Sequence, residues 1–462
     1  MSAQLSSFFA VRQRSRSPAA GTRQGGAASL IVVMILFFVM ALVAAYTNRN
    51  LIFEARTSIN QYRSTQAVET AEAGLEWAVA QLNGGRILGN CTEPGIPSPN
   101  LSFRQRYLGI DPSSGMITAL TQAAGAPPPP RRAGCIWNGA GWTCDCPING
   151  DPVLPAQAAN GIHPAFWVSF STASVSLPGV VQIIVNGCTS LDPACLGADD
   201  TTINAEGLAR LSTLVALKSS LTTPPAAALT VFGQVVGGGA LSAYNTEGDR
   251  GGITIQAGGA VNSATFTLGT IPGTPTPSVI AGDPSLSGIA GVPAAPPRQP
   301  LPIPAADRVF ASTFGAWPAA FRLQPGAVIF NCPAGGCRQA LADTVAMNPD
   351  RVIWIDGDLT IESAGDVGSP PDPADLTVAG PATIVATGNL IFTAPGRIYG
   401  FVYTRSGNWT GSGEVQGAAF SEANLAATAA PTVVFNGAVI DSLRLRAGSF
   451  VRVPGSWRDF RQ

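Results

Sequence analysis

The sequence has little of what most enzymes and nucleic-acid-binding proteins need. It contains one histidine, His163, and only 12% charged residues, with a net charge of −1. Because this charge is weak and balanced, no basic surface is available to attract nucleic acid, and we expect no nucleic-acid partner. The G-x-S-x-G phrase of many hydrolases is absent. We therefore predict a protein that is not an enzyme, with no catalytic residues and no cofactor.

Metal-binding patterns are also missing. Cys144-Asp-Cys146 lacks the C-x₂₋₄-C spacing of a zinc knuckle. Asp356-Gly-Asp358 lacks the other ligands of an EF-hand calcium loop and is predicted to be a solvated turn. We predict no metal site.

Cysteine is present in an even number, and every cysteine follows an apolar run near the N-terminus. This distribution is typical of disulfides in an oxidising compartment. Cys188 with Cys195, and Cys332 with Cys337, each bracket a short loop, so local pairing is the simplest prediction. The sequence leaves open the pairing of the other candidates, which are Cys91, Cys135, Cys144 and Cys146.

Long helices are disfavoured after the N-terminal region, because the chain contains 52 glycines and 38 prolines. Residues 85–225 are predicted to form a disulfide-containing, β-rich head region. Residues 226–304 are predicted to be a Gly/Pro-rich β segment and linker, with residues 291–310 as the best linker candidate. Residues 305–462 are predicted to form a separate β region.

One long uncharged run stands out against this background. Residues 27–45 carry no charge, and at about 1.5 Å per residue a helix of this length nearly spans a hydrocarbon core of about 30 Å. The preceding residues include four arginines, and no acidic residue occurs before Glu54. The excess of positive charge predicts a cytoplasmic N-terminus and export of the chain after Tyr46.

The helix is expected to continue beyond the membrane. Apolar or small residues recur every three to five positions, as expected for one face of a helix: Ala55, Ile59, Tyr62, Ala67, Ala71, Leu75, Ala78 and Leu82. This pattern predicts one helix to about Asn83, stopped by Gly84-Gly85. Its narrow stripe is expected to lie against a globular head or a neighbouring helix.

Taken together, these features resemble a type IV pilin precursor: a basic leader ending in glycine, residues 1–26, then an apolar segment and an amphipathic extension, residues 27–84. More narrowly, the segment resembles the N-terminal domain of PilX-type pilus assembly proteins, in which a phrase like that of Gln66–Leu75 marks the helix beyond the membrane. The resemblance covers roughly residues 23–84.

The resemblance implies cleavage by a prepilin peptidase between Gly26 and Ala27, with the bond between Gly25 and Gly26 as the competitor. It also implies packing against the helices of other subunits, where small residues let backbones approach; these are Ala27, Ala28, Ser29, Ala41, Ala44 and Ala45. Major pilins carry a glutamate at the fifth mature position, but Ile31 stands there in this chain. A subunit without that carboxylate is similar to initiating or tip-located minor pilins.

The C-terminal region contains two internal alignments without gaps. Residues 352–361 align with residues 383–392, and residues 397–403 align with residues 414–420, with Gly400 opposite Gly417. A small residue at a turn with alternating apolar neighbours is typical of stacked β rungs. The spacing predicts a β-solenoid-like region, with a folded β-sandwich as the structural rival.

The sequence therefore predicts an α+β protein, with one membrane-spanning pilin-like helix and a β-rich exported head. We expect a minor pilin or pilus assembly subunit, first in the inner membrane with a periplasmic head and later on the pilus surface. Expected partners are other pilins, inner-membrane assembly components, prepilin peptidase and membrane lipid. One alternative is a pilus-borne adhesin with a surface or sugar ligand. Another is a membrane-anchored solenoid enzyme acting on polysaccharide, because carboxylate separation cannot be derived from sequence.

Overall fold

The computed structural model describes residues 26–123, 125, 127–155, 163–173, 177–189, 207–237, 239–262, 264–270, 278–291, 304–429 and 431–459. The chain forms two compact units, Met1–Tyr62 and Arg63–Gln462. We call the second unit the head. The prediction of a long apolar N-terminal helix followed by a β-rich region is confirmed.

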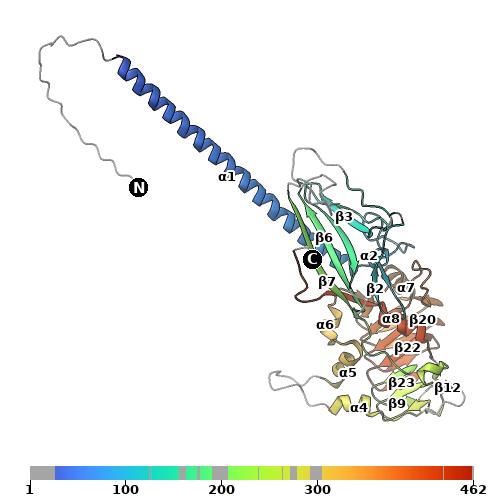
Figure 1. Cartoon of the computed structure of the whole chain (residues 1–462). Helices are drawn as coiled ribbons and strands as arrows, with labels where there is room; N and C mark the ends of the chain where they lie inside the picture. Colours follow the sequence, from blue (N-terminus) through green and yellow to red (C-terminus); the bar gives the residue numbers. More distant parts are fainter. Residues whose placement is uncertain are drawn as a thin grey trace, which may run out of the picture. The chain divides into compact units, whose positions relative to one another are not determined.

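Helix α1 spans Gly26–Leu82 (Figure 1). In the first unit, the described side chains from Ser29 to Tyr62 are exposed, with the large apolar ones from Leu30 to Phe53 about half exposed or more. Helix α1 is long and apolar enough to cross a membrane, with a mean hydropathy of 2.8 over an 18-residue stretch. In the head the predicted stripe is buried, at Ala67, Ala71, Leu75, Ala78 and Leu82.

The helix stops where the two glycines were expected to stop it. Glycine is required at position 85 because the backbone there passes close to another segment: a Cβ atom would lie 2.5 Å from the carbonyl oxygen of Met347. Met347 is the last residue of α7, Arg338–Met347. Glycine therefore lets the chain leaving α1 pass directly against the end of a second helix.

The first layer of the head is an antiparallel sheet in the order β25-β7-β6-β5-β3-β4. Its strands are β3 (Arg132–Trp137), β4 (Trp142–Asp145), β5 (Ala165–Thr172), β6 (Val180–Cys188), β7 (Leu208–Ser219) and β25 (Gly448–Arg452). The buried residues of one face, including Phe166, Val168 and Val185, share a core with Ala67, Ala71 and Leu75 of α1. The short α2 (Phe103–Tyr107) and the hairpin of β1 (Leu108–Ile110) and β2 (Ile117–Ala119) complete this layer.

Residues 220–447 leave this sheet after β7 and return to it at β25, and we call them the parallel β unit. Its strands before residue 304 are β8 (Leu229–Val231), β9 (Val235–Gly237), β10 (Ser242–Asn245), β11 (Ile255–Ala257), β12 (Thr267–Thr270) and β13 (Val279–Ile280). Its later strands are β14 (Ala327–Phe330), β15 (Val352–Ile355), β16 (Leu359–Ile361), β17 (Gly365–Val367), β18 (Ala382–Ala386), β19 (Leu390–Phe392), β20 (Gly396–Thr404), β21 (Asn408–Thr410), β22 (Glu414–Ser421), β23 (Leu425–Thr428) and β24 (Thr432–Phe435). The helical elements are η1 (Gly248–Arg250), α4 (Pro284–Gly291), α5 (Ala305–Phe314), α6 (Pro318–Arg322), α7 and α8 (Gly437–Leu445).

The two sequence alignments coincide with the register of the parallel strands. Val352 of β15 pairs with Thr383 of β18, and β16 pairs with β19 in the same register. Gly400 pairs with Gly417. Their φ angles are +156° and +144°, and a Cβ atom would lie 1.9 Å from the Ala382 oxygen at Gly400 and 2.1 Å from the Gly400 oxygen at Gly417. Only glycine fits both positions.

The expected domain boundary near residue 304 does not separate two sheets. Strands β8, β9 and β10 pair with β22, β23 and β24, so strands on both sides of the predicted linker belong to the same sheets (Figure 1). Within residues 291–310, residues 292–303 lie outside the described residues, and α5 begins at Ala305. The last strand, β25, pairs with β7 of the antiparallel sheet. Parallel pairing is what stacked rungs require, while a β-solenoid stays a prediction.

Candidate functional site

The contact between α1 and the antiparallel sheet depends on small residues. Ala67 and Ala71 are fully buried. A Cβ atom at Gly187 of β6 would lie 2.5 Å from both the Ala67 oxygen and the Ala71 nitrogen, and one at Gly74 of α1 would lie 2.8 Å from Phe166. The backbones of helix and strand therefore meet directly at this point, which explains why the Gln66–Leu75 phrase contains so many small residues.

We expect Gly187→Ala to destabilise the head by about 1–3 kcal/mol, because the added Cβ must push α1 away from β6. Thermal unfolding of the full chain in detergent measures the effect. Gly141→Ala is the matched control, since a Cβ atom there meets nothing within 4 Å. Equal melting temperatures for the two variants would contradict direct helix–strand contact.

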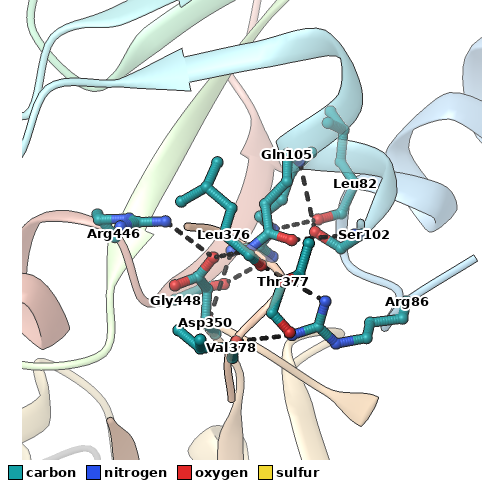
Figure 2. A network of polar contacts seen from close by, with 11 residues as sticks. Leu82, Arg86, Ser102, Gln105, Asp350, Leu376, Thr377, Val378, Arg446 and Gly448 are labelled. Carbon is teal, nitrogen blue, oxygen red and sulfur yellow. Dashed lines mark hydrogen bonds and ion pairs between the residues drawn. The ribbon is translucent and has the colours of Figure 1, made fainter. Parts of the chain in front are cut away.

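The end of α1 is held by buried arginines, and we call this cluster the arginine junction. It consists of Arg86, Arg104 and Arg106 together with Asn83 and Asp350. The three arginines are 1–3% exposed. They come from the segment after α1 and from α2, and Figure 2 shows Arg86 reaching Thr377 and Val378 while Arg446 points toward Asp350.

Arg104 joins three parts of the head through backbone carbonyls. Its Nε donates to the Leu82 oxygen at 2.8 Å, and its Nη2 donates to the Gly448 oxygen at 3.1 Å. Its Nη1 lies 3.5 Å from the Asp350 oxygen. Leu82 ends α1, where a helix leaves carbonyls without partners. The guanidinium therefore caps α1 and binds the start of β25 at once.

Arg86 binds a second set of carbonyls. Its Nη2 donates to Thr377 at 2.8 Å and to Val378 at 2.7 Å, and its backbone N–H donates to Met347 at 2.8 Å. Its Nε and Nη1 also donate to the carbonyls of Ala346 and Asn100. Arg86 thereby connects the chain after α1 to the end of α7 and to the loop before β18.

Asn83 and Arg106 extend the junction toward the antiparallel sheet. The Asn83 amide donates to the Phe450 oxygen at 2.9 Å and accepts from the Phe450 N–H at 2.8 Å, as a neighbouring strand would. Arg106 donates to the Cys146 oxygen at 2.7 Å and to the Ile87 carbonyl. The segment after α1 is thus bonded to β25 on one side and to the loop after β4 on the other.

Burial in the junction disfavours the positive charge of its arginines, and nearby carboxylates partly offset this effect. Burial lowers the pKa of Arg104 to about 10, an effect that the Asp350 carboxylate opposes. Burial likewise lowers the pKa of Arg86, against the effect of Asp350 and then Asp375. Asp350 has a φ of 64°, accepts from the Gln105 amide at 3.4 Å and lies 4.0 Å from Arg446. Arginine stays charged at neutral pH, so these side chains act by holding segments of the head together.

Comparison with known proteins identifies a family-specific domain at the N-terminus. Residues 25–76 match the family model described as PilX N-terminal. The chain carries a PilX-type N-terminal domain. No curated protein matches. Among solved structures, the chain is similar to the competence-associated pilin ComZ from Thermus thermophilus, with 12% identity, a TM-score of 0.21, and coverage of 86% of this chain and 97% of that chain.

The PilX-type domain includes most residues that the sequence singled out for processing and packing. Helix α1 begins at Gly26, so of the predicted leader, residues 1–26, all but the last residue lie outside the described residues. The side chains of Ala27 and Ala28 also lie outside the description. Ser29, Ala41, Ala44 and Ala45 lie on the exposed part of α1. Cleavage and helix packing therefore stay predictions.

One of the two predicted disulfide pairs is present among the described residues. Cys332 pairs with Cys337, as predicted from the short loop. The pairs left open by the sequence are Cys91–Cys146 and Cys135–Cys144. Cys188 is disulfide-bonded, while its predicted partner, Cys195, lies outside the described residues.

The rejected calcium motif has a structural role. Asp356 accepts from the Trp354 indole at 2.8 Å and pairs with Arg322 at 2.5 Å, and these bonds lower its pKa. Asp358 accepts from the Asn389 backbone and side chain at 2.7 and 2.9 Å. Among the described residues, no group of three His, Cys, Asp or Glu side chains could hold a metal ion.

The arginine junction is absent from the predictions made from the sequence. A signal was present: Ser102 and Gln105 form a capping box at α2, and this pattern is visible in the sequence three residues apart. It would have located α2 and therefore the two arginines on it. It would not have shown which carbonyls they bind, because those partners are up to 344 residues away.

Proposed function

We propose that this protein is a minor pilin or pilus assembly subunit of a type IV pilus-like machine. Its α1 would insert into the helical core of the filament, and its head would lie at or near the tip. The observation that carries the proposal is the PilX-type domain, whose first part exposes a continuous apolar surface from Leu30 to Tyr46.

That exposed surface needs a cover. Apolar side chains such as Phe37 and Phe38, which are 74% and 66% exposed, are stable only in lipid or against other apolar helices. Membrane lipid would cover this surface before assembly, and the apolar helices of other pilins would cover it after assembly. The small residues Ala41, Ala44 and Ala45 would allow close approach of neighbouring backbones.

Ile31 supports a position at the start of the filament. A buried ammonium of a neighbouring subunit needs an opposite charge nearby. Ile31 supplies none, so this chain would not make the usual contact to the subunit above it. We therefore propose an initiating or tip-located subunit, with its N-terminus cytoplasmic and its head periplasmic before assembly.

The test of the proposed function is N-terminal sequencing of the mature protein by mass spectrometry, from cells with and without prepilin peptidase. We expect a mature N-terminus at Ala27, or at Gly26, only in cells that contain the peptidase. An intact leader in both strains would contradict the pilin pathway and leave α1 as a simple membrane anchor.

Adhesion is the second candidate function. It is favoured by a pocket on the antiparallel sheet, which is separate from α1 and from the arginine junction. Deletion of the head separates the two roles: filaments that still form but no longer attach indicate adhesion, and loss of filaments indicates assembly.

A further inference from the structure

A pocket of about 430 Å³ lies over strands β3, β5, β6 and β7 of the antiparallel sheet. On β5 the residues Phe166 and Val168 face the core shared with α1. Trp167 and Ser169 alternate with them and line the pocket. Successive side chains of a strand point to opposite faces, so the pocket lies on the face of the sheet turned away from α1. Its volume is within the range of small-molecule sites.

The strand register gathers the polar residues of the pocket into neighbouring rows. Arg132 of β3 is paired with Ser169 of β5. In the adjacent row, Trp167 is paired with Asn186 of β6, which is paired with Arg210 of β7. Directly paired residues lie about 4.5–5.5 Å apart and successive rows about 7 Å apart. Arg132 and Arg210 therefore lie on the same face of the sheet, on β3 and β7, with Ser169, Trp167 and Asn186 between them.

Arg132 is held in place from two sides. Its guanidinium lies 5.3 Å from the centre of the Trp167 ring, and its Nη1 lies 3.6 Å from Asp151. The Asp151 side chain is 51% exposed, and such an exposed pair is weak. A guanidinium has five N–H donors. Arg132 therefore keeps donors for a second anion while its orientation is fixed.

Hydroxyl groups complete the lining. Ser169 and Ser171 both line the pocket, and neither hydroxyl has a hydrogen bond within the part of the chain that the structure describes. Each can donate one bond and accept others. Of the described residues that line the pocket, none is acidic.

We propose that this pocket binds an acidic saccharide, with the carboxylate at Arg132 and the sugar hydroxyls at Ser169 and Ser171. Guanidinium groups bind carboxylates through charge-assisted, often bidentate, hydrogen bonds. Free serine hydroxyls match a ligand that both donates and accepts. The proposal goes beyond the assembly role, because binding needs a folded head but no filament.

An acidic peptide fits this surface less well. Extended peptides usually gain affinity by adding a strand to an open sheet edge. The pocket lies over the middle strands, where the sheet presents side chains instead of free backbone groups. A ligand with hydroxyls around a carboxylate matches the guanidinium and the serine hydroxyls that line the pocket.

The experiment is isothermal titration calorimetry of the full chain in detergent with three probes: digalacturonate, neutral maltose and the dipeptide Glu-Glu. We expect binding of digalacturonate and at least about tenfold weaker binding of the other two. Arg132→Gln is expected to weaken digalacturonate binding at least about tenfold, because a charge-assisted contact is lost. Arg322→Gln is the control, since it removes an arginine paired with an exposed aspartate elsewhere in the head.

Ser169→Ala combined with Ser171→Ala serves as a second variant, in case Arg132→Gln unfolds the sheet. It keeps both arginines, and it should weaken the binding of digalacturonate several-fold while leaving the melting temperature unchanged. Three results would overturn the proposal: no binding of digalacturonate at millimolar concentration, binding that both variants leave unchanged, or equal binding of Glu-Glu. None of these results depends on leader cleavage, so the proposed assembly function is tested independently.

Discussion

Replacing Arg104 by alanine is expected to lower the free energy of unfolding of the head by about 3–5 kcal/mol. Arg104 is 1% exposed, and its guanidinium serves carbonyls from α1, from the Asp350 turn and from β25. Its removal leaves a cavity and buried carbonyls without donors, each of which carries a desolvation penalty of about 1–3 kcal/mol. Water that enters the cavity recovers a part of this loss.

Denaturant unfolding of the full chain in detergent measures this change. Arg452→Ala is the matched control, because Arg452 is 38% exposed and pairs with Glu76 at 2.7 Å. An exposed pair of this kind contributes at most about 1 kcal/mol. Arg104→Lys should fall between the two, since an ammonium keeps the charge but cannot match the fork of donors. An equal effect of the Arg104 and Arg452 alanine variants would rule out the junction as a source of stability.

The second large effect is expected for the disulfide between Cys91 and Cys146. It closes 55 residues of chain, and the double alanine variant should lose about 4 kcal/mol of stability by loop-closure entropy. The bond also lies beside the junction, because Arg106 donates to the Cys146 oxygen at 2.7 Å. Its loss should therefore loosen the segment that follows α1.

The pair Cys332–Cys337 provides the comparison, since it closes only 5 residues. The same entropy argument gives about 2 kcal/mol for its double alanine variant. Differential scanning calorimetry of the two variants, each against the wild-type chain, tests the difference. Equal losses would show that loop length does not decide the contribution of these bonds.

Local patterns made the helix and the strand register predictable. The repeat of small residues from Ala67 to Leu82 identifies the face of α1 that is buried in the head. The aligned glycines at Gly400 and Gly417 identify strands that lie next to each other. In both cases the information is contained in short spacings, because helices and stacked strands place residues at fixed intervals.

Connections between distant segments were not predictable. The return of β25 to β7, the pairing of β8 and β9 with β22 and β23, and the Cys91–Cys146 bond all join residues without a shared local pattern. The predicted boundaries follow composition, and the proline-rich stretch near residue 300 predicts a linker for that reason. Composition does not show which sheet edges meet after the chain folds.

The sequence by itself determined the long apolar helix, the PilX-type phrase and the parallel register, because each depends on contacts between residues at regular spacing. The tertiary structure alone decided where the arginines bind and which side chains line the pocket. Arg104 meets Gly448 across 344 residues, and Arg132 meets Ser169 only because β3 and β5 are paired. Such sites arise from the packing of remote segments, and the energy that holds them is absent until those segments meet.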